Sequence, residues 1–200
     1  FNSIKEATSS LPSLVASGIS AIELLDATSL RVARADAKAT QLLKNLDVQA
    51  HAGLLIEYQE LNPLDLEKRM GAANEVISRF ALHSSSPLSS ESAARADLWH
   101  IRKGLYATVA GARPTGATAL LEDIAVPVPA LAETCESLIS LFDEYKYQDS
   151  VIFGHAKDGN IHFMLNEDFT ETDDVSRYSR FTDSMSELVL SHNGTLKAEH

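Results

Sequence analysis

The stretch FGHAKDGNIHF, residues 153–163, constrains the fold more than any other part of this chain. Two runs of strand-forming residues, 150–156 and 161–165, flank the pair Asp158-Gly159. An Asp-Gly pair between two such runs is among the strongest short-range signals of a β-hairpin, because a type I′ turn needs positive φ at both central residues. The pattern therefore predicts an antiparallel pair of strands near the end of the chain.

The predicted hairpin brings two histidines together. With the Asp-Gly pair at the turn centre, His155 lies directly opposite His162, and Phe153 and Met164 follow on the same face as an apolar floor. Opposed residues have Cβ atoms about 4.5–5.5 Å apart, so both rings can reach one ion at about 2.0–2.1 Å. The spacing favours two ligands of a mononuclear metal site, with a hydrogen-bonded histidine pair as the alternative.

The last residues offer a third ligand, which a catalytic metal site generally has. Gly194 closes a predicted helix, and the segment TLKAEH follows it as a short extended stretch. Adjacent side chains of an extended chain point to opposite sides, so Glu199 would face the ion and His200 a substrate. A frayed terminus is the alternative for both residues.

Periodicity and turn signals divide the rest of the chain into strands and long helices. Asn62 and Pro63 have the pattern of a helix N-cap followed by proline at the first helical position. The expected strands cover 19–25, 52–61 and 118–128, and the expected helices cover 36–46, 62–82, 94–111, 129–145 and 175–194. This order predicts an α+β fold, in which helices pack on one face of an antiparallel sheet, as one domain.

Composition excludes several classes of protein. The chain of 200 residues has a formal net charge of -11 and no cluster of Lys and Arg, which argues against nucleic-acid binding. No apolar run approaches the roughly 18–20 residues of a transmembrane helix. Cys135 is the single cysteine, which excludes a disulfide framework and a thiolate zinc site and favours a packing role. We expect a reduced, cytoplasmic setting. Because the chain starts at Phe1, we also expect a piece of a longer protein.

Several segments together resemble a known family. GHAKDGNIH is similar to the motif GHxGDGNxH, and NGTLKAEH is similar to the segment GxxxxEHG, interrupted before its glycine. LWHIRKGL, EDIAVPVPALAE and AIELLDATSL resemble further segments in the expected order. These motifs belong to the C-terminal substrate (cap) domain of FAD-linked oxidases and D-2-hydroxy-acid dehydrogenases, the group of D-lactate, glycolate and D-2-hydroxyglutarate dehydrogenases. The resemblance extends over residues 1–200.

The resemblance implies a ferredoxin-like cap domain that closes over a flavin held by a separate domain. That FAD-binding domain is absent from this chain, which has no glycine-rich phosphate loop and no residue that we assign to the flavin. The parent protein would oxidise a D-2-hydroxy acid, of the lactate or 2-hydroxyglutarate type, to the 2-oxo acid and pass the hydride to flavin. The isolated chain is expected to be inactive. The electron acceptor is unidentified, and homo-oligomerisation is left open.

The resemblance also assigns roles to particular residues. His155, His162 and Glu199 would bind a divalent metal, with zinc favoured, and His200 would be the general base. Arg102 would bind the carboxylate of the substrate.

Three further expectations follow from the resemblance. Met164 replaces a polar substrate-contacting residue of some D-2-hydroxyglutarate enzymes, so the substrate is open. The segment TLKAEH resembles long variants that carry an iron–sulfur domain. A location on the inner face of the membrane, as a peripheral protein, is the alternative to a free cytoplasmic one.

Two other classes of function fit the same residues. A metal-dependent hydrolase can also use two histidines, one glutamate and an open coordination position, and it would act without flavin. A non-catalytic small-molecule-binding module would keep the hairpin but need no ion.

Overall fold

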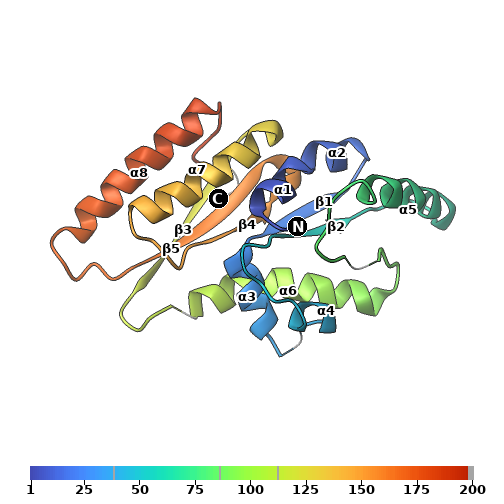
Figure 1. Ribbon diagram of the computed structural model, residues 1–200, viewed down its shortest axis with the longest axis horizontal. Helices are drawn as coiled ribbons and strands as arrows, with labels where there is room; N and C mark the ends of the chain where they lie inside the picture. Colours follow the sequence, from blue (N-terminus) through green and yellow to red (C-terminus); the bar gives the residue numbers. More distant parts are fainter. Residues whose placement is uncertain (38, 86, 112, 198–200) are drawn as a thin grey trace.

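The computed structural model describes residues 1–37, 39–85, 87–111 and 113–197, and its centre is a five-stranded antiparallel sheet (Figure 1). Every neighbouring pair of strands is antiparallel, so the predicted α+β class is confirmed. In spatial order the strands are β2 (Gly53–Glu57), β1 (Ala21–Leu25), β4 (Val151–His155), β5 (Asn160–Glu167) and β3 (Thr118–Ala125).

The larger helix layer covers one face of this sheet (Figure 1). Its members are α1 (Ile4–Ser9), α2 (Leu11–Ala16), α7 (Leu131–Glu144) and α8 (Asp174–Ser191). Ile152 and Phe163 point from the sheet into the core beneath these helices, where Cys135 is fully buried. The packing role predicted for the cysteine is thus confirmed. Helix α5 (Pro63–Ile77) packs its last turn, at Val76 and Ile77, against the same core.

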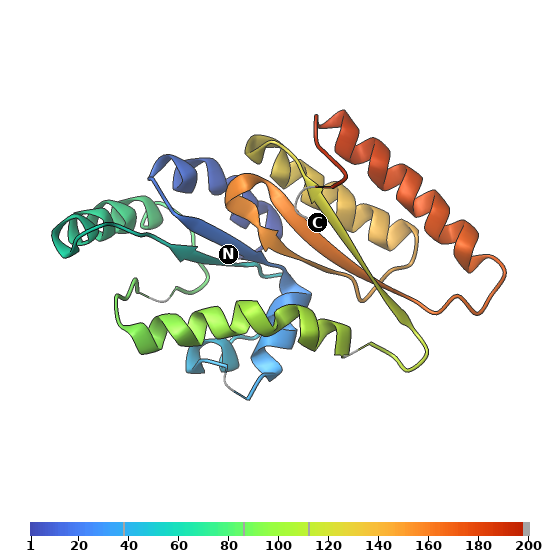
Figure 2. The same ribbon diagram turned by 180° about the vertical axis from the view of Figure 1, so that it is seen from behind.

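Helices also cover the opposite face, whereas the prediction had placed them on one face. Figure 2 shows α6 (Ser92–Gly111) running along this side together with α3 (Ala27–Ala35) and α4 (Gln41–Lys44). Phe153 and Met164 are buried here beneath Leu105 of α6. The central strands therefore carry apolar side chains on both faces, and strands of that kind need cover on both sides.

The hairpin β4–β5 forms as predicted, but its turn and register differ from the prediction. Phe153, and not His155, lies opposite His162. The connection is a single 3-10 turn, η2 (Ala156–Asp158), followed by Gly159 at φ 72°. The predicted two-residue type I′ turn was therefore wrong, because the chain uses a longer loop that ends in a left-handed glycine. A Cβ atom at Gly159 would lie 1.9 Å from the carbonyl oxygen of Val126, so only glycine fits.

Local helix signals were reliable where a cap was present. The Asn62 side chain accepts a hydrogen bond from the backbone N–H of Asp65, and α5 begins at Pro63, as predicted. The helix expected from Pro129 starts as a 3-10 turn, η1 (Val128–Ala130), and continues as α7. The helix expected over 36–46 was too long, since α4 is the one helix that the described residues of this range form.

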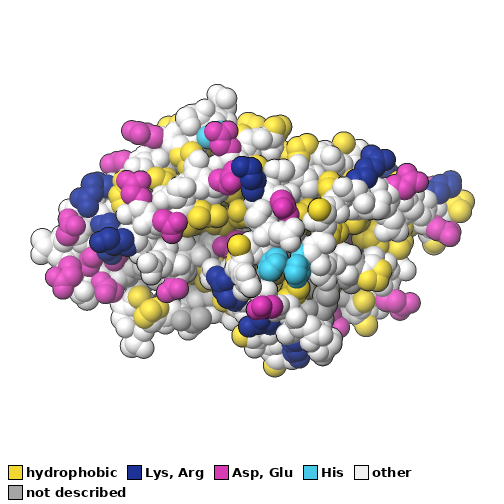
Figure 3. All heavy atoms as spheres, in the orientation of Figure 1, with side chains coloured by type: hydrophobic (Ala, Val, Ile, Leu, Met, Phe, Trp, Pro, Cys, Tyr) yellow, Lys and Arg dark blue, Asp and Glu magenta, His cyan; other side chains and the backbone are white. Residues whose placement is uncertain are grey.

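The surface carries side chains of both charge signs. Acidic and basic side chains are interspersed on the face seen in Figure 3, and acidic ones gather toward the α8 end. This distribution is consistent with the net charge of -11. Within the described ranges, no helix is both long enough and apolar enough to cross a membrane.

Candidate active site

Polar side chains from four strands gather on the sheet face that carries α3 and α6. The register sets Glu23 beside His155 and Asp123 beside His162. Side chains alternate along a strand, so these residues share one face with the buried Phe153. The members of this polar cluster are Glu23 on β1, His155 on β4, His162 and Asn160 on β5, and Asp123 on β3.

The two predicted metal ligands lie side by side. The ring centroids of His155 and His162 are 5.5 Å apart, and the ring planes are nearly perpendicular at 87°. The His162 side chain is 7% exposed and the His155 side chain 37% exposed, so one ring is buried and the other reaches the surface. The predicted pairing of the rings is correct although the register was not, because a shift of two residues keeps a side chain on the same face.

Each ring has a carboxylate oxygen close to Nδ1. The Nδ1 atom of His155 is 2.8 Å from Oε1 of Glu23, and Nδ1 of His162 is 3.3 Å from Oδ1 of Asp123. The hydrogen bond to Glu23 favours, for His155, the tautomer with the proton on Nδ1 and the lone pair on Nε2. Asp123 lies at ion-pair distance on the same side of the His162 ring. Histidines that bind metals are generally oriented in this way by a carboxylate or carbonyl group. The described residues therefore fit a metal bound through Nε2 of both rings.

Glu23 also binds the arginine predicted to contact substrate. The Nε group of Arg102, from α6, donates a hydrogen bond to Oε2 of Glu23 at 2.6 Å. The guanidinium group lies over the ring of Phe153, 5.4 Å from its centroid, and the side chain is 13% exposed. Nε is thereby used within the protein, and the two Nη groups have the geometry to receive another carboxylate.

Sequence reasoning did not find the two carboxylates that orient the histidines. The signal for Glu23 was a charged residue inside the apolar run AIELL, which a buried strand tolerates only when the charge is paired. Asp123 is held by Asn160, whose side-chain amide donates to Oδ1 of Asp123 at 2.6 Å and to the carbonyl oxygen of Ile124 at 2.9 Å. Asn160 therefore contributes to the cluster as well as beginning β5.

The predicted third ligand and base, Glu199 and His200, lie outside the described residues. The segment that leads to them begins next to the cluster, since Thr195 and Ala125 exchange backbone hydrogen bonds of 2.8 and 3.0 Å. Gly194 permits this approach, because a Cβ atom there would be 2.5 Å from the carbonyl oxygen of Ala125.

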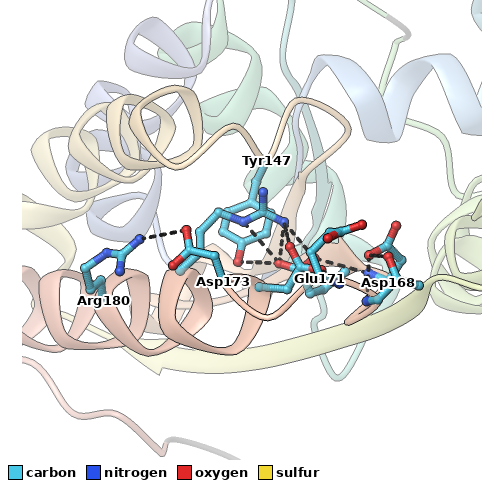
Figure 4. Close-up of polar contacts among 9 residues, drawn as sticks. Tyr147, Asp168, Glu171, Asp173 and Arg180 are labelled. Atoms are coloured by element: carbon cyan, nitrogen blue, oxygen red, sulfur yellow. Dashed lines mark hydrogen bonds and ion pairs between the residues drawn. The ribbon is translucent and has the colours of Figure 1, made fainter.

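A second polar cluster, at the junction of β5 and α8, is drawn in Figure 4. Glu167, Asp168 and Asp174 are the one set of three potential metal ligands within bonding reach of each other in the described ranges. Glu167 is already bound by Arg177 at 2.7 and 2.8 Å and by the hydroxyl of Tyr147 at 3.0 Å. Burial, together with the hydrogen bond to Glu167, raises the pKa of Tyr147 to about 12. These contacts describe a structural clamp and not an ion site.

Comparison with known proteins decides the family. The whole chain, residues 1–200, matches the family described as FAD linked oxidases, C-terminal domain. The chain belongs to this family. The FAD-linked oxidase relatives include a probable mitochondrial D-lactate dehydrogenase of Danio rerio, 27% identical over the full chain and 38% of the relative. Glycolate oxidase subunit GlcD of Escherichia coli strain K12 is 25% identical, again over the full chain and 38% of the relative.

Two further proteins are similar to this chain. A D-2-hydroxyglutarate dehydrogenase of Xanthomonas citri pv. viticola is 31% identical over 58% of the chain and 24% of the relative. The solved structure of an alkyldihydroxyacetonephosphate synthase superposes with a TM-score of 0.66 at 13% identity, over 98% of this chain and 39% of the other, which shows a shared fold. The chain thus spans about two fifths of the length of the D-lactate dehydrogenase and glycolate oxidase relatives.

Proposed function

We propose that the protein containing this chain is an FAD-dependent dehydrogenase. It oxidises a D-2-hydroxy acid, of the lactate or 2-hydroxyglutarate type, to the 2-oxo acid, and this chain supplies its substrate-binding and catalytic side chains. The observation that carries the proposal is the polar cluster, in which two adjacent imidazoles each have a carboxylate beside Nδ1. One of those carboxylates, the buried Glu23, also holds an arginine.

His155 and His162, with Glu199 as third ligand, would hold a divalent metal such as zinc. The Nδ1 contacts to Glu23 and Asp123 support this role, because a carboxylate on the Nδ1 side leaves Nε2 of each ring as the coordinating atom. When bound, such an ion supplies Lewis-acid stabilisation of the oxygen that loses its proton.

His200 would take the proton from the substrate hydroxyl. Histidine suits this step, since its reference pKa of about 6.5 lies close to neutral pH. The bridge between Thr195 and Ala125 supports the assignment, because Ala125 pairs with Asn160 of the cluster and the segment TLKAEH therefore starts beside it.

Arg102 would bind the substrate carboxylate through its two Nη groups in a bidentate fork. The contacts with Glu23 and the ring of Phe153 hold the guanidinium plane, so little rotational freedom is lost when substrate binds. The flavin, when bound, supplies the acceptor for the hydride.

The test uses the full-length protein with its flavin. We expect oxidation of D-2-hydroxy acids but not their L-isomers, loss of turnover after treatment with a chelator, and recovery on addition of zinc. Turnover that is indifferent to chelation would contradict the metal assignment. Hydrolytic activity in flavin-free protein would favour the metal-dependent hydrolase instead.

A further inference from the structure

We infer that the preferred substrate is a monocarboxylic 2-hydroxy acid with an apolar side chain several carbons long. The inference rests on the proposed function and goes further, because it names the substrate class and the place where the side chain binds. That place is a cavity along the edge strand β2, which begins beside Arg102.

The cavity has the size of a ligand pocket. Its volume is about 610 Å³, and pockets for small molecules commonly measure about 300–1,000 Å³. It runs along β2 between α5 and α6, and serine-rich residues between these helices, including Ser84, Ser85, Ser89 and Ser90, form part of its lining. Arg102 lies in the wall. The side chain that binds Glu23 of the polar cluster therefore also lines the cavity.

The strand register links the two regions. Glu23 pairs with His155 of β4 on one side and with Leu55 of β2 on the other. Neighbouring strands are about 4.8 Å apart, so Leu55 lies on the order of 10 Å from His155, with Glu23 between them. A hydroxy acid that reacts beside His155 with its carboxylate on Arg102 can therefore extend its side chain toward Leu55.

The side chains that line the cavity near Arg102 suit a hydrocarbon chain. The apolar lining residues there are Leu25, Leu30, Leu55, Leu98, Trp99 and Ile101. The two arginines in the described lining are both paired, Arg102 with Glu23 at 2.6 Å and Arg95 with Glu57 at 2.9 Å. The other ionisable lining side chains are Glu60, Tyr58 and the tilted rings of His51 and His83, whose centroids are 4.2 Å apart. A second substrate carboxylate would lose water here without gaining an unpaired arginine, so a dicarboxylate is disfavoured.

The test measures kcat/KM of the full-length holoenzyme for D-lactate, D-2-hydroxybutanoate, D-2-hydroxyhexanoate and D-2-hydroxyglutarate. We expect kcat/KM to rise by about fourfold for each buried methylene group, and 2-hydroxyhexanoate to exceed 2-hydroxyglutarate. Leu55→Trp, which fills the cavity, should lower the ratio of kcat/KM for 2-hydroxyhexanoate to that for lactate at least tenfold. Leu98→Trp provides the same test from α6 if the first variant does not fold.

Leu66→Trp is the matched control, because Leu66 lines the cavity from α5 and not from α6, which carries Arg102, and it should keep the ratio. If the enzyme oxidises hydroxy acids but kcat/KM is flat or falls with chain length, or if 2-hydroxyglutarate is preferred, the inference is overturned and the proposed function stands. If the enzyme oxidises no 2-hydroxy acid, the proposed function is overturned and the inference falls with it.

Discussion

Oε1 of Glu23 lies 2.8 Å from Nδ1 of His155, while Oε2 of the same carboxylate accepts a hydrogen bond of 2.6 Å from Arg102. The Glu23 side chain is 5% exposed, so it is shielded from water. One buried carboxylate on β1 therefore orients both a proposed metal ligand on β4 and a proposed substrate-binding residue on α6. In the proposed function, this shared contact would couple the position of the ion to that of the substrate.

Replacing Glu23 should impair the proposed roles of both His155 and Arg102. In Glu23→Gln the amide group faces one of the two N–H donors, so either His155 or Arg102 loses its acceptor. We expect zinc affinity and kcat/KM to fall by about 10–100-fold, as for other residues that orient metal ligands. Chelator competition and steady-state kinetics measure both quantities. Glu57→Gln, which breaks a pair with Arg95, is the control and should retain zinc affinity. Unaltered zinc affinity in Glu23→Gln would speak against the coupling.

Arg102 should affect substrate binding more than turnover. Arg102→Lys removes the bidentate fork but keeps the charge, and the lost charge-assisted hydrogen bonds correspond to a rise in KM of about 10–100-fold with a smaller change in kcat. Arg95→Lys, on the same helix, is the matched control. A lowered melting temperature with an unchanged KM would instead assign Arg102 a structural role.

The clamp at Glu167 should control stability and not activity. Glu167→Gln removes the carboxylate that Arg177 binds at 2.7 and 2.8 Å, while the pair of Arg177 with Asp174 at 3.2 Å remains, and loss of charge-assisted hydrogen bonds of this kind costs about 2 kcal/mol of unfolding free energy. Asp173→Asn breaks an exposed pair with Arg180, where Asp173 is 78% exposed, and should cost less than about 1 kcal/mol. Urea unfolding compares the two variants. Equal losses of unfolding free energy in the two variants would rule out a larger contribution of the clamp to stability.

Asp26 should make stability depend on pH. Burial raises the pKa of this carboxyl to about 6, although the backbone N–H groups of Ser29 and Ile152 oppose the shift. Its unfolded pKa is about 3.9, so between roughly pH 4 and 6 the folded state binds more protons than the unfolded state. The contribution of Asp26 to stability is therefore largest below pH 4 and declines as pH rises to about 6. Urea unfolding of Asp26→Asn should lack this decline, and an identical pH profile in both proteins would disprove it.

Local signals in the sequence predicted elements whose causes are local. Asn62 and Pro63 start α5 because a cap and a fixed φ act within one turn. The turn of the hairpin was missed because the approach of Gly159 to the carbonyl oxygen of Val126 involves a distant part of the chain. The second helix layer was missed because it depends on which side of the sheet Phe153 and Met164 face after folding.

The candidate site likewise has residues placed by local sequence and residues placed only by the sheet. The two histidines are close in sequence, so a hairpin argument was enough to bring them together. Glu23 is 132 residues from His155 and meets it only through the pairing of β1 with β4. Asp123 likewise reaches His162 only through the register of β3 and β5. The positions of the residues that would orient the proposed ligands thus depend on the order of strands in the sheet, which motif spacing does not specify.

The metal content of the full-length flavoprotein tests the central claim most directly. We predict about one zinc ion per chain in the wild type, and loss of both zinc and D-2-hydroxy-acid oxidation in His155→Ala and His162→Gln, with the flavin spectrum and the circular dichroism of the fold retained. Undiminished zinc content and turnover in both variants would contradict the claim that this pair of histidines forms the catalytic metal site.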